Sequence, residues 1–332
     1  MKYFLRIFLP LCILGLVYFL GPKQKYATPK LLDTDIQVTL DSLDEYVRQH
    51  DSIVPDIKQG NDAKIIWAND SLKTKTEYAL VYLHGFSASR EEGAPIHEDF
   101  ARRYGMNLYL TRLEDHGRRD TNSFIHITPD SYLQSAEDAI DIGKLLGKKV
   151  IVMSCSTGGT LSLILAAAGE DIYSLIMYSP NIDIADRKSD LLLQPWGKQI
   201  AKLVLDGEYN RIVYDTLAQK YWNSVYHFNG IFTTKALIRE YMHDATFQKI
   251  HIPVFVGYYF KDEDHQDDVV SVSAMLHMFD ALGTPENQKT LVDFPEAGHH
   301  VISSHVMSHD VEGVEQATFH WAEKTLGLRP VQ

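Results

Sequence analysis

Cysteine is scarce in this chain of 332 residues, and basic residues are fewer than acidic ones. The two cysteines, Cys12 and Cys155, could form one bridge at most, so the sequence excludes a disulfide framework. Against 44 aspartates and glutamates there are 32 lysines and arginines, which gives a formal net charge of −12. This charge argues against nucleic acid as a partner, because nucleic-acid-binding proteins obtain most of their affinity from basic patches.

The sequence also lacks internal repeats and low-complexity segments. Its composition, with 45% hydrophobic and 23% charged residues, is that of an ordinary globular protein. A disordered tail, a collagen and a polytopic membrane protein are therefore excluded. At roughly 150 residues per domain, the length allows two domains or one large α/β domain with an insertion.

One uncharged run, IFLPLCILGLVYFL at residues 7–20, lies between basic residues on both sides. We interpret residues 1–25 as a signal segment or membrane anchor. The run is short against the ~20 residues that cross a bilayer, although residues 3–21 would suffice if Arg6 reached the interface. No small-x-small cleavage site follows the run, which favours an uncleaved anchor, and Leu11 before Cys12 argues against a lipoprotein. The basic flanks are nearly balanced and do not set the orientation; we favour an exported domain.

The body of the chain alternates strand-like and helix-like segments. Residues 26–62 are predicted to be a linker and a first helix. Short apolar runs predict strands at 63–67, 78–83, 107–111, 149–154, 174–178, 252–258 and 290–294. Helices are predicted at 94–104, 128–146, 157–168, 271–282 and 311–326. This alternation predicts an α/β domain at 63–332, with a mostly parallel sheet covered on both faces. Residues 182–250 lack a comparable strand and are rich in tyrosine and tryptophan, so we expect a helical insertion there.

A candidate nucleophile lies between the strand at 149–154 and the helix that follows it, in the sequence SCSTGG at 154–159. A strand-turn-helix segment of this kind can lift one hydroxyl above a sheet, as a nucleophile elbow does. Ser156 fits this position, because two glycines follow it and allow the strand and helix to approach closely. A helix N-cap is the alternative role for this serine. Cys155 is a rival nucleophile, but the residue two positions after it is not glycine.

Oxyanion donors are expected from two places. The strand at 78–83 ends in the tight turn His84-Gly85-Phe86-Ser87. Acyl transfer needs two backbone N–H groups directed at the developing oxyanion. In this arrangement they would come from Phe86 and from Thr157, the residue after the candidate nucleophile.

An orienting carboxylate is expected in the acidic loop KDEDHQDDVV at 261–270, which follows a predicted strand. Such a group must be held rigidly beyond the carboxyl end of the strand. Asp267 fits best, because the two valines shortly after it can hold the loop against the core. Asp264 and Asp268 are its rivals.

A general base is expected in the sequence PEAGHH at 295–300, because a histidine after the last strand can reach across to the serine. We predict that the base is His299, directly after the glycine turn, rather than His300. A metal site that includes His305 and His309 is disfavoured, because the loop lacks the HExxH spacing and any cysteine ligand.

From about residue 78 to the C-terminus, the chain resembles the α/β-hydrolase superfamily. The resemblance is to its capped carboxylesterases and monoacylglycerol-lipase-like enzymes, which are also grouped with serine aminopeptidase-like hydrolases. The motifs that carry it are, in order, HGFSAS at 84–89, LEDHG at 113–117, SCSTGG at 154–159, DDVVS at 267–271 and AGHH at 297–300. The chain departs from the family pattern at Ser154 and Asp115, where relatives often have glycine.

The resemblance implies an α/β-hydrolase fold with a helical cap at about 182–250. It implies a serine hydrolase without cofactor or metal, which cleaves carboxylic esters through an acyl-enzyme formed on Ser156, with Asp267 and His299 completing the triad. The aromatic insertion and the N-terminal segment together suggest a small lipophilic ester as substrate, near a membrane. An aminopeptidase or amidase with the same triad is one alternative. A membrane-tethered binding protein without catalysis is the other.

Overall fold

The computed structural model describes residue 12 and residues 15–30 and 36–331. Much of the predicted N-terminal anchor, residues 1–11 and 13–14, lies outside this range. Within the described residues, no helix has both the length and the apolar character needed to span a bilayer. The anchor therefore stays a prediction.

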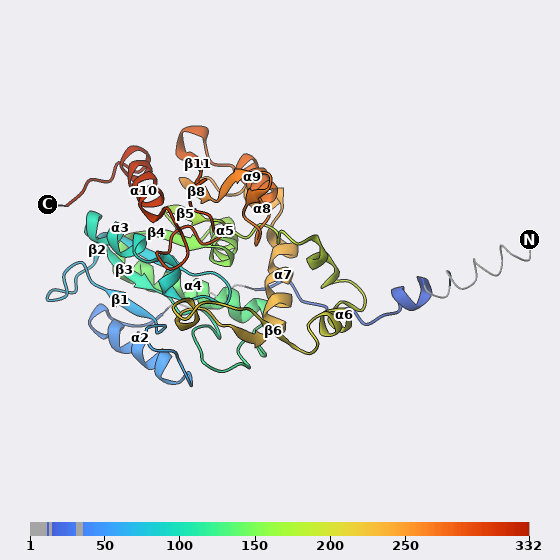
Figure 1. The fold of residues 1–332 in the computed structure, drawn as a ribbon. Coiled ribbons are helices and arrows are strands. Elements are labelled where there is room, and N and C mark those ends of the chain that lie inside the picture. The colour runs from blue at the N-terminus through green and yellow to red at the C-terminus, as the bar shows by residue number, and fades with distance from the viewer. Residues whose placement is uncertain (1–11, 13–14, 31–35, 332) are drawn as a thin grey trace, which may run out of the picture.

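A seven-stranded sheet forms the centre of the molecule (Figure 1). Its strands, in spatial order, are β1 (Lys64–Ile66), β3 (Asn107–Leu110), β2 (Thr76–Leu83), β4 (Gly147–Cys155), β5 (Ser174–Tyr178), β8 (Val254–Tyr258) and β11 (Lys289–Asp293). Only the edge strand β1 is antiparallel to its neighbour, and the other pairs are parallel. The carboxyl ends of the parallel strands therefore meet along one edge, where such sheets carry their sites.

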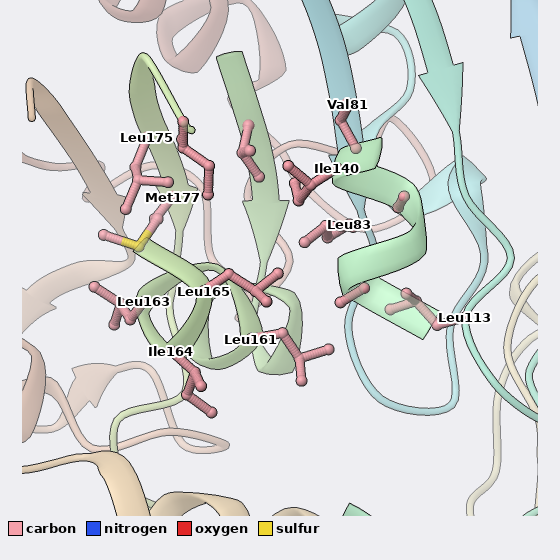
Figure 2. Close-up of a cluster of buried hydrophobic side chains, with 14 of the residues drawn as sticks. Val81, Leu83, Leu113, Ile140, Leu161, Leu163, Ile164, Leu165, Leu175 and Met177 are labelled. Atoms are coloured by element: carbon pink, nitrogen blue, oxygen red, sulfur yellow. The ribbon is translucent and has the colours of Figure 1, made fainter. Parts of the chain in front are cut away.

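The strands are apolar on both faces because helices cover both. In β2, Val81 and Leu83 belong to one buried cluster, while Leu80 and Tyr82 belong to another. The first cluster includes side chains from α2 (Leu43–Ser52), α4 (Pro129–Leu146), α5 (Thr157–Ala168) and α9 (Val272–Ala281). The second includes side chains from α3 (Ile96–Tyr104) and α10 (Val311–Thr325). Figure 2 shows part of the first cluster, with Leu161 and Leu165 of α5 beside the strands.

Local sequence signals fix several element boundaries. Thr128 accepts the Ser131 N–H and forms a capping box at the start of α4, with Pro129 in the first turn. Gly105 ends α3 in the left-handed conformation. The predicted strands and helices of the body are confirmed, with boundaries that shift by a few residues at most.

The segment between β5 and β8 forms the predicted insertion, and Figure 1 shows α6, β6 and α7 beside the sheet. Its elements are a 3₁₀ turn (Arg187–Leu191), α6 (Gly197–Val204), β6 (Tyr209–Arg211), a 3₁₀ turn (Ala218–Lys220), β7 (Val225–His227), α7 (Asn229–Tyr241) and α8 (Asp244–Phe247). Most of its regular elements are helical, but β6 and β7 pair as an antiparallel ribbon, which the sequence pattern does not predict. Strands of three residues are too short to show an alternating pattern.

Candidate active site

Ser156 lies at the sharp turn between β4 and α5, as the sequence predicts. Its backbone has φ 52° and ψ −120°, a strained conformation that a non-glycine residue adopts only where the surrounding structure requires it. Its N–H donates to Tyr178 O at 3.0 Å, and its carbonyl accepts the N–H groups of Gly159 and Asn181, both at 2.9 Å. These bonds attach the turn to the end of β5, to the residues after it and to the first turn of α5.

The glycine after the turn is needed because the helix approaches β2 very closely. A β-carbon on Gly158 would lie 2.0 Å from the Leu83 carbonyl oxygen, which is rigid backbone. Ser154, the departure from the usual glycine, is fully buried, and its small side chain fits there without displacing the strands.

Cys155 points into the core between the sheet and the helices that cover it, and it is fully buried. Burial raises the pKa of its thiol well above the ordinary value, so the reactive thiolate is disfavoured. Of the two candidates in this turn, the structure therefore favours Ser156 over Cys155 as the nucleophile.

Asp267 is held as expected beyond the end of β8. Its carboxylate oxygen Oδ1 accepts the N–H groups of Val269 and Val270, both at 3.0 Å. Val270 is fully buried and fixes the loop to the core, whereas the Val269 side chain is half exposed. The rivals Asp264 and Asp268 are exposed.

The histidine that contacts Asp267 is His300 and not the predicted His299. His300 Nδ1 donates to Asp267 Oδ2 at 2.7 Å, and both side chains are buried. Burial alone would lower the pKa of His300, but the Asp267 carboxylate outweighs this effect and the pKa is raised. The same pair keeps the pKa of Asp267 low despite its burial, because protonated His300 stabilises the carboxylate.

His299 has a different environment. Its Nδ1 accepts the Val301 N–H at 3.0 Å. Burial lowers the pKa of His299, and the neighbouring His300 lowers it further. The preference for the residue directly after the glycine turn was therefore wrong about the partner of Asp267. Gly298, with φ +66°, reverses the chain, and the second residue after it faces the aspartate.

The two predicted oxyanion donors flank this site. The N–H of Thr157 is in the first turn of α5, where helix amides have no partner within the helix. Across the described part of the chain, neither this N–H nor that of Phe86 has a hydrogen-bond acceptor. The turn that carries Phe86 is anchored by His84, whose Nε2 accepts the Leu113 N–H at 3.1 Å while Nδ1 donates to Gly85 O at 2.9 Å. Burial lowers the pKa of His84 to about 4, so its ring is neutral and suits this pair of bonds.

A cavity of about 540 Å³ joins these groups. Its polar lining includes Ser156, His299, His300, Thr157 and Glu92, and Asp267 lies behind His300. Its apolar lining comes from both the sheet loops and the insertion: Phe86, Ile184, Ile212, Val213, Tyr214, Trp222, Tyr226, Ile231, Val269, Val301 and Met307. Ser156 Oγ and His300 share this space, and no hydrogen bond joins these two described side chains; in enzymes without substrate such bonds are commonly long.

The second departure from the family pattern also has a structural explanation. Asp115 has φ 61°, a conformation that usually favours glycine. Its carboxylate accepts the Phe124 N–H and pairs with Arg118, so the side chain stabilises the loop. Glycine could adopt this backbone conformation but could not make either bond.

Comparison with known proteins gives matches in structure only. No protein-family model matches the sequence, and no curated protein matches it. Among solved structures, one from the work on LipS and LipT, two metagenome-derived lipolytic enzymes, superposes with a TM-score of 0.64 at 14% identity, over 81% of this chain and 99% of the other. This chain has the α/β-hydrolase fold.

Two monoacylglycerol lipases of this fold also match. A soluble variant of the monoglyceride lipase from Saccharomyces cerevisiae, in complex with a substrate analogue, has a TM-score of 0.60 at 14% identity and covers 80% of this chain and 91% of its own. The monoacylglycerol lipase of Paleococcus ferrophilus has a TM-score of 0.55 at 14% identity, over 78% and 96% of the two chains. At such low identity the matches show the shared fold alone.

Proposed function

We propose that this protein is a serine hydrolase that cleaves carboxylic esters of small lipophilic compounds, with Ser156 as nucleophile, His300 as general base and Asp267 as its orienting acid. The observation that carries the proposal is the buried Asp267–His300 pair at 2.7 Å, beside a cavity that also contains Ser156 at a strained turn. Three groups from three separate loops meet there, which the fold alone does not require.

The hydrogen bonds support a separate role for each group. Because Asp267 is ionised and accepts from Nδ1, His300 carries its proton there and keeps Nε2 free as a base. In this mechanism Nε2 takes the proton of the Ser156 hydroxyl as the serine attacks the ester carbonyl. The N–H groups of Phe86 and Thr157 stabilise the oxyanion, and water later releases the acid through the same base.

The cavity supports a lipophilic substrate. Valine, isoleucine and aromatic side chains dominate its lining, and several of them come from the insertion. Burial of an acyl chain against such a surface contributes roughly 0.8 kcal/mol for each methylene group. The predicted N-terminal anchor would place this cavity near a membrane, where such esters concentrate.

The test is covalent labelling with a fluorophosphonate, followed by intact-mass measurement of the wild type and single variants. We expect one adduct on the wild type, no adduct on Ser156→Ala and strongly slowed labelling of His300→Ala. His299→Ala serves as the matched control and should label at a rate close to that of the wild type. A folded wild type that forms no adduct would contradict the proposal.

A second assay separates esters from amides. Matched p-nitrophenyl esters and p-nitroanilides of the same acyl group are compared by kcat/KM. Faster turnover of the ester is expected. Faster turnover of the anilide would replace the esterase proposal with an amidase that uses the same triad.

A further inference from the structure

Glu92 is a buried carboxyl group in the cavity with no part in the proposed triad. It lies in a short 3₁₀ turn (Arg90–Gly93) and is only 2% exposed. A carboxyl group at such a site is costly unless hydrogen bonds compensate for the lost water. Burial raises the pKa of Glu92 to about 7, and the backbone bond from Gly85 and the nearby His300 limit that rise.

Glu92 is hydrogen-bonded to the turn at residues 84–87, named here the oxyanion loop because it carries the Phe86 N–H. Its Oε2 accepts the Gly85 N–H at 2.5 Å and the Tyr82 hydroxyl at 3.3 Å. A β-carbon on Gly85 would lie 2.7 Å from Glu92 Oε1 and 3.0 Å from the Ser156 β-carbon. Glu92 and the candidate nucleophile therefore both pack closely against Gly85.

This contact bears on Phe86 because of peptide geometry. The Gly85 carbonyl and the Phe86 N–H belong to one planar peptide group and point in opposite directions when it is trans. His84 holds the Gly85 carbonyl, and Glu92 holds the Gly85 N–H. With both polar groups of Gly85 fixed, the direction of the Phe86 N–H is fixed as well.

The 3₁₀ turn that carries Glu92 is also hydrogen-bonded to the segment that follows His300. Ser303 Oγ donates to the Glu92 carbonyl at 2.9 Å, and Ser304 Oγ donates to the Glu91 carbonyl at 3.0 Å. The 3₁₀ turn thus connects the oxyanion loop with the loop that carries His300. A shift of the turn would move both.

We propose that Glu92 is a positioning residue, whose carboxylate holds the Gly85 amide so that the Phe86 N–H faces the oxygen that becomes negatively charged during ester cleavage. This inference rests on the proposed serine-hydrolase function. Glu92 touches neither the substrate carbonyl nor the transferred proton in this role.

Three substitutions separate the features of the side chain. Glu92→Gln keeps an acceptor oxygen at full reach but loses the charge. Glu92→Asp keeps the charge but shortens the reach by one methylene group. Glu92→Met keeps the approximate volume and has neither the charge nor an oxygen acceptor. Glu137→Met is the matched control, because Glu137 is also buried but lies on α4 and does not line the cavity.

The measurements are kcat and KM for an ester and the inhibition constant of a boronic acid, whose tetrahedral adduct places an oxygen in the oxyanion site. For Glu92→Met we expect kcat to fall about 100-fold, as when one oxyanion donor is lost, with boronate affinity falling in parallel and KM nearly unchanged. Glu92→Asp should lose about tenfold in kcat, whereas Glu92→Gln should stay within about threefold of the wild type, because its amide oxygen can still accept. Thermal unfolding establishes that each variant is folded, and Glu92→Asp carries the test if Glu92→Met is not.

Two results would overturn the inference while leaving the hydrolase proposal intact. One is full kcat in both folded Glu92→Met and folded Glu92→Asp. The other is a loss in Glu92→Gln as large as that in Glu92→Met, which would show that charge rather than the hydrogen bond matters. A wild type that neither labels nor turns over esters would overturn the proposed function, and this inference with it.

Discussion

The turn after β4 and the loop after β11 both present a side chain to the same cavity, but different contacts place the two side chains. Ser156 is fixed locally, by a tight turn between a strand and the helix that follows at once. His300 is fixed by Asp267, which is 33 positions away in the chain and lies in another loop. A local signal can therefore identify the first residue, whereas only the folded chain identifies the second.

The largest effect should come from the turn after β4. We expect Ser156→Ala to lower kcat for ester cleavage by about 10⁴-fold or more, because the attacking oxygen is removed. Ser154→Ala and Cys155→Ala, in the same turn, should lower it by less than about tenfold, since neither side chain reaches the cavity. Kinetics with a chromogenic ester make the comparison, and an equal loss in Cys155→Ala would contradict the assignment.

The two adjacent histidines should differ almost as strongly. His300→Ala removes the base and the partner of Asp267, so kcat should fall by about 10⁴-fold or more. His299→Ala removes only an acceptor for the Val301 N–H, and a loss below about tenfold is expected. The same ester assay on both variants checks this order. A larger loss of kcat in His299→Ala than in His300→Ala would indicate that His299 is the base.

The close approach at the turn also predicts a stability difference. Gly158→Ala forces a β-carbon against the Leu83 carbonyl and should lower the free energy of unfolding by about 3 kcal/mol. Gly169→Ala, at the end of α5, should cost only about 1 kcal/mol, because nothing lies within 4 Å and only the positive φ is unfavourable. Urea unfolding measures both. Equal losses would show that the structure relaxes the contact with β2, because Gly158 lies in a helix and has no positive φ.

Much of the fold is readable from the sequence because its signals are short-range. Apolar strands such as β5, the proline and capping threonine of α4, and the glycine that ends α3 each act within a few residues. The ribbon of β6 and β7 was missed because its strands, with the sequences YNR and VYH, lack the apolar run that identifies β1, which is equally short. Its pairing depends on neighbours in the insertion that no local pattern encodes.

The candidate site, like the fold, could be predicted from the sequence only where its signals are local. Ser156 and Asp267 carry local signals, a turn with glycines and a loop followed by valines. The structure places Ser156 at the cavity and Asp267 against His300. Which histidine faces Asp267 depends on the backbone conformation of the turn at Gly298, which the sequence does not specify. Glu92 was missed altogether, because a glutamate in a polar stretch has no mark in the sequence of a group that will be buried against Gly85.

The smallest predicted effect is that of Asp268→Asn, because Asp268 is exposed whereas its neighbour Asp267 is buried. Because Asp267 raises the pKa of His300, the base should become protonated at a higher pH than an ordinary histidine, and kcat/KM should fall on that acid side. Asp268 also raises this pKa from an exposed position. Asp268→Asn should therefore move the acid limb downward by a fraction of a pH unit and leave kcat at high pH unchanged, with a shift that shrinks at high salt.

Asp267→Asn should move the limb further down and lower kcat by about 10⁴-fold, because the tautomer and orientation of His300 are lost together. Profiles of kcat/KM against pH at two salt concentrations measure both, and a larger shift in Asp268→Asn than in Asp267→Asn would contradict the pairing of Asp267 with His300.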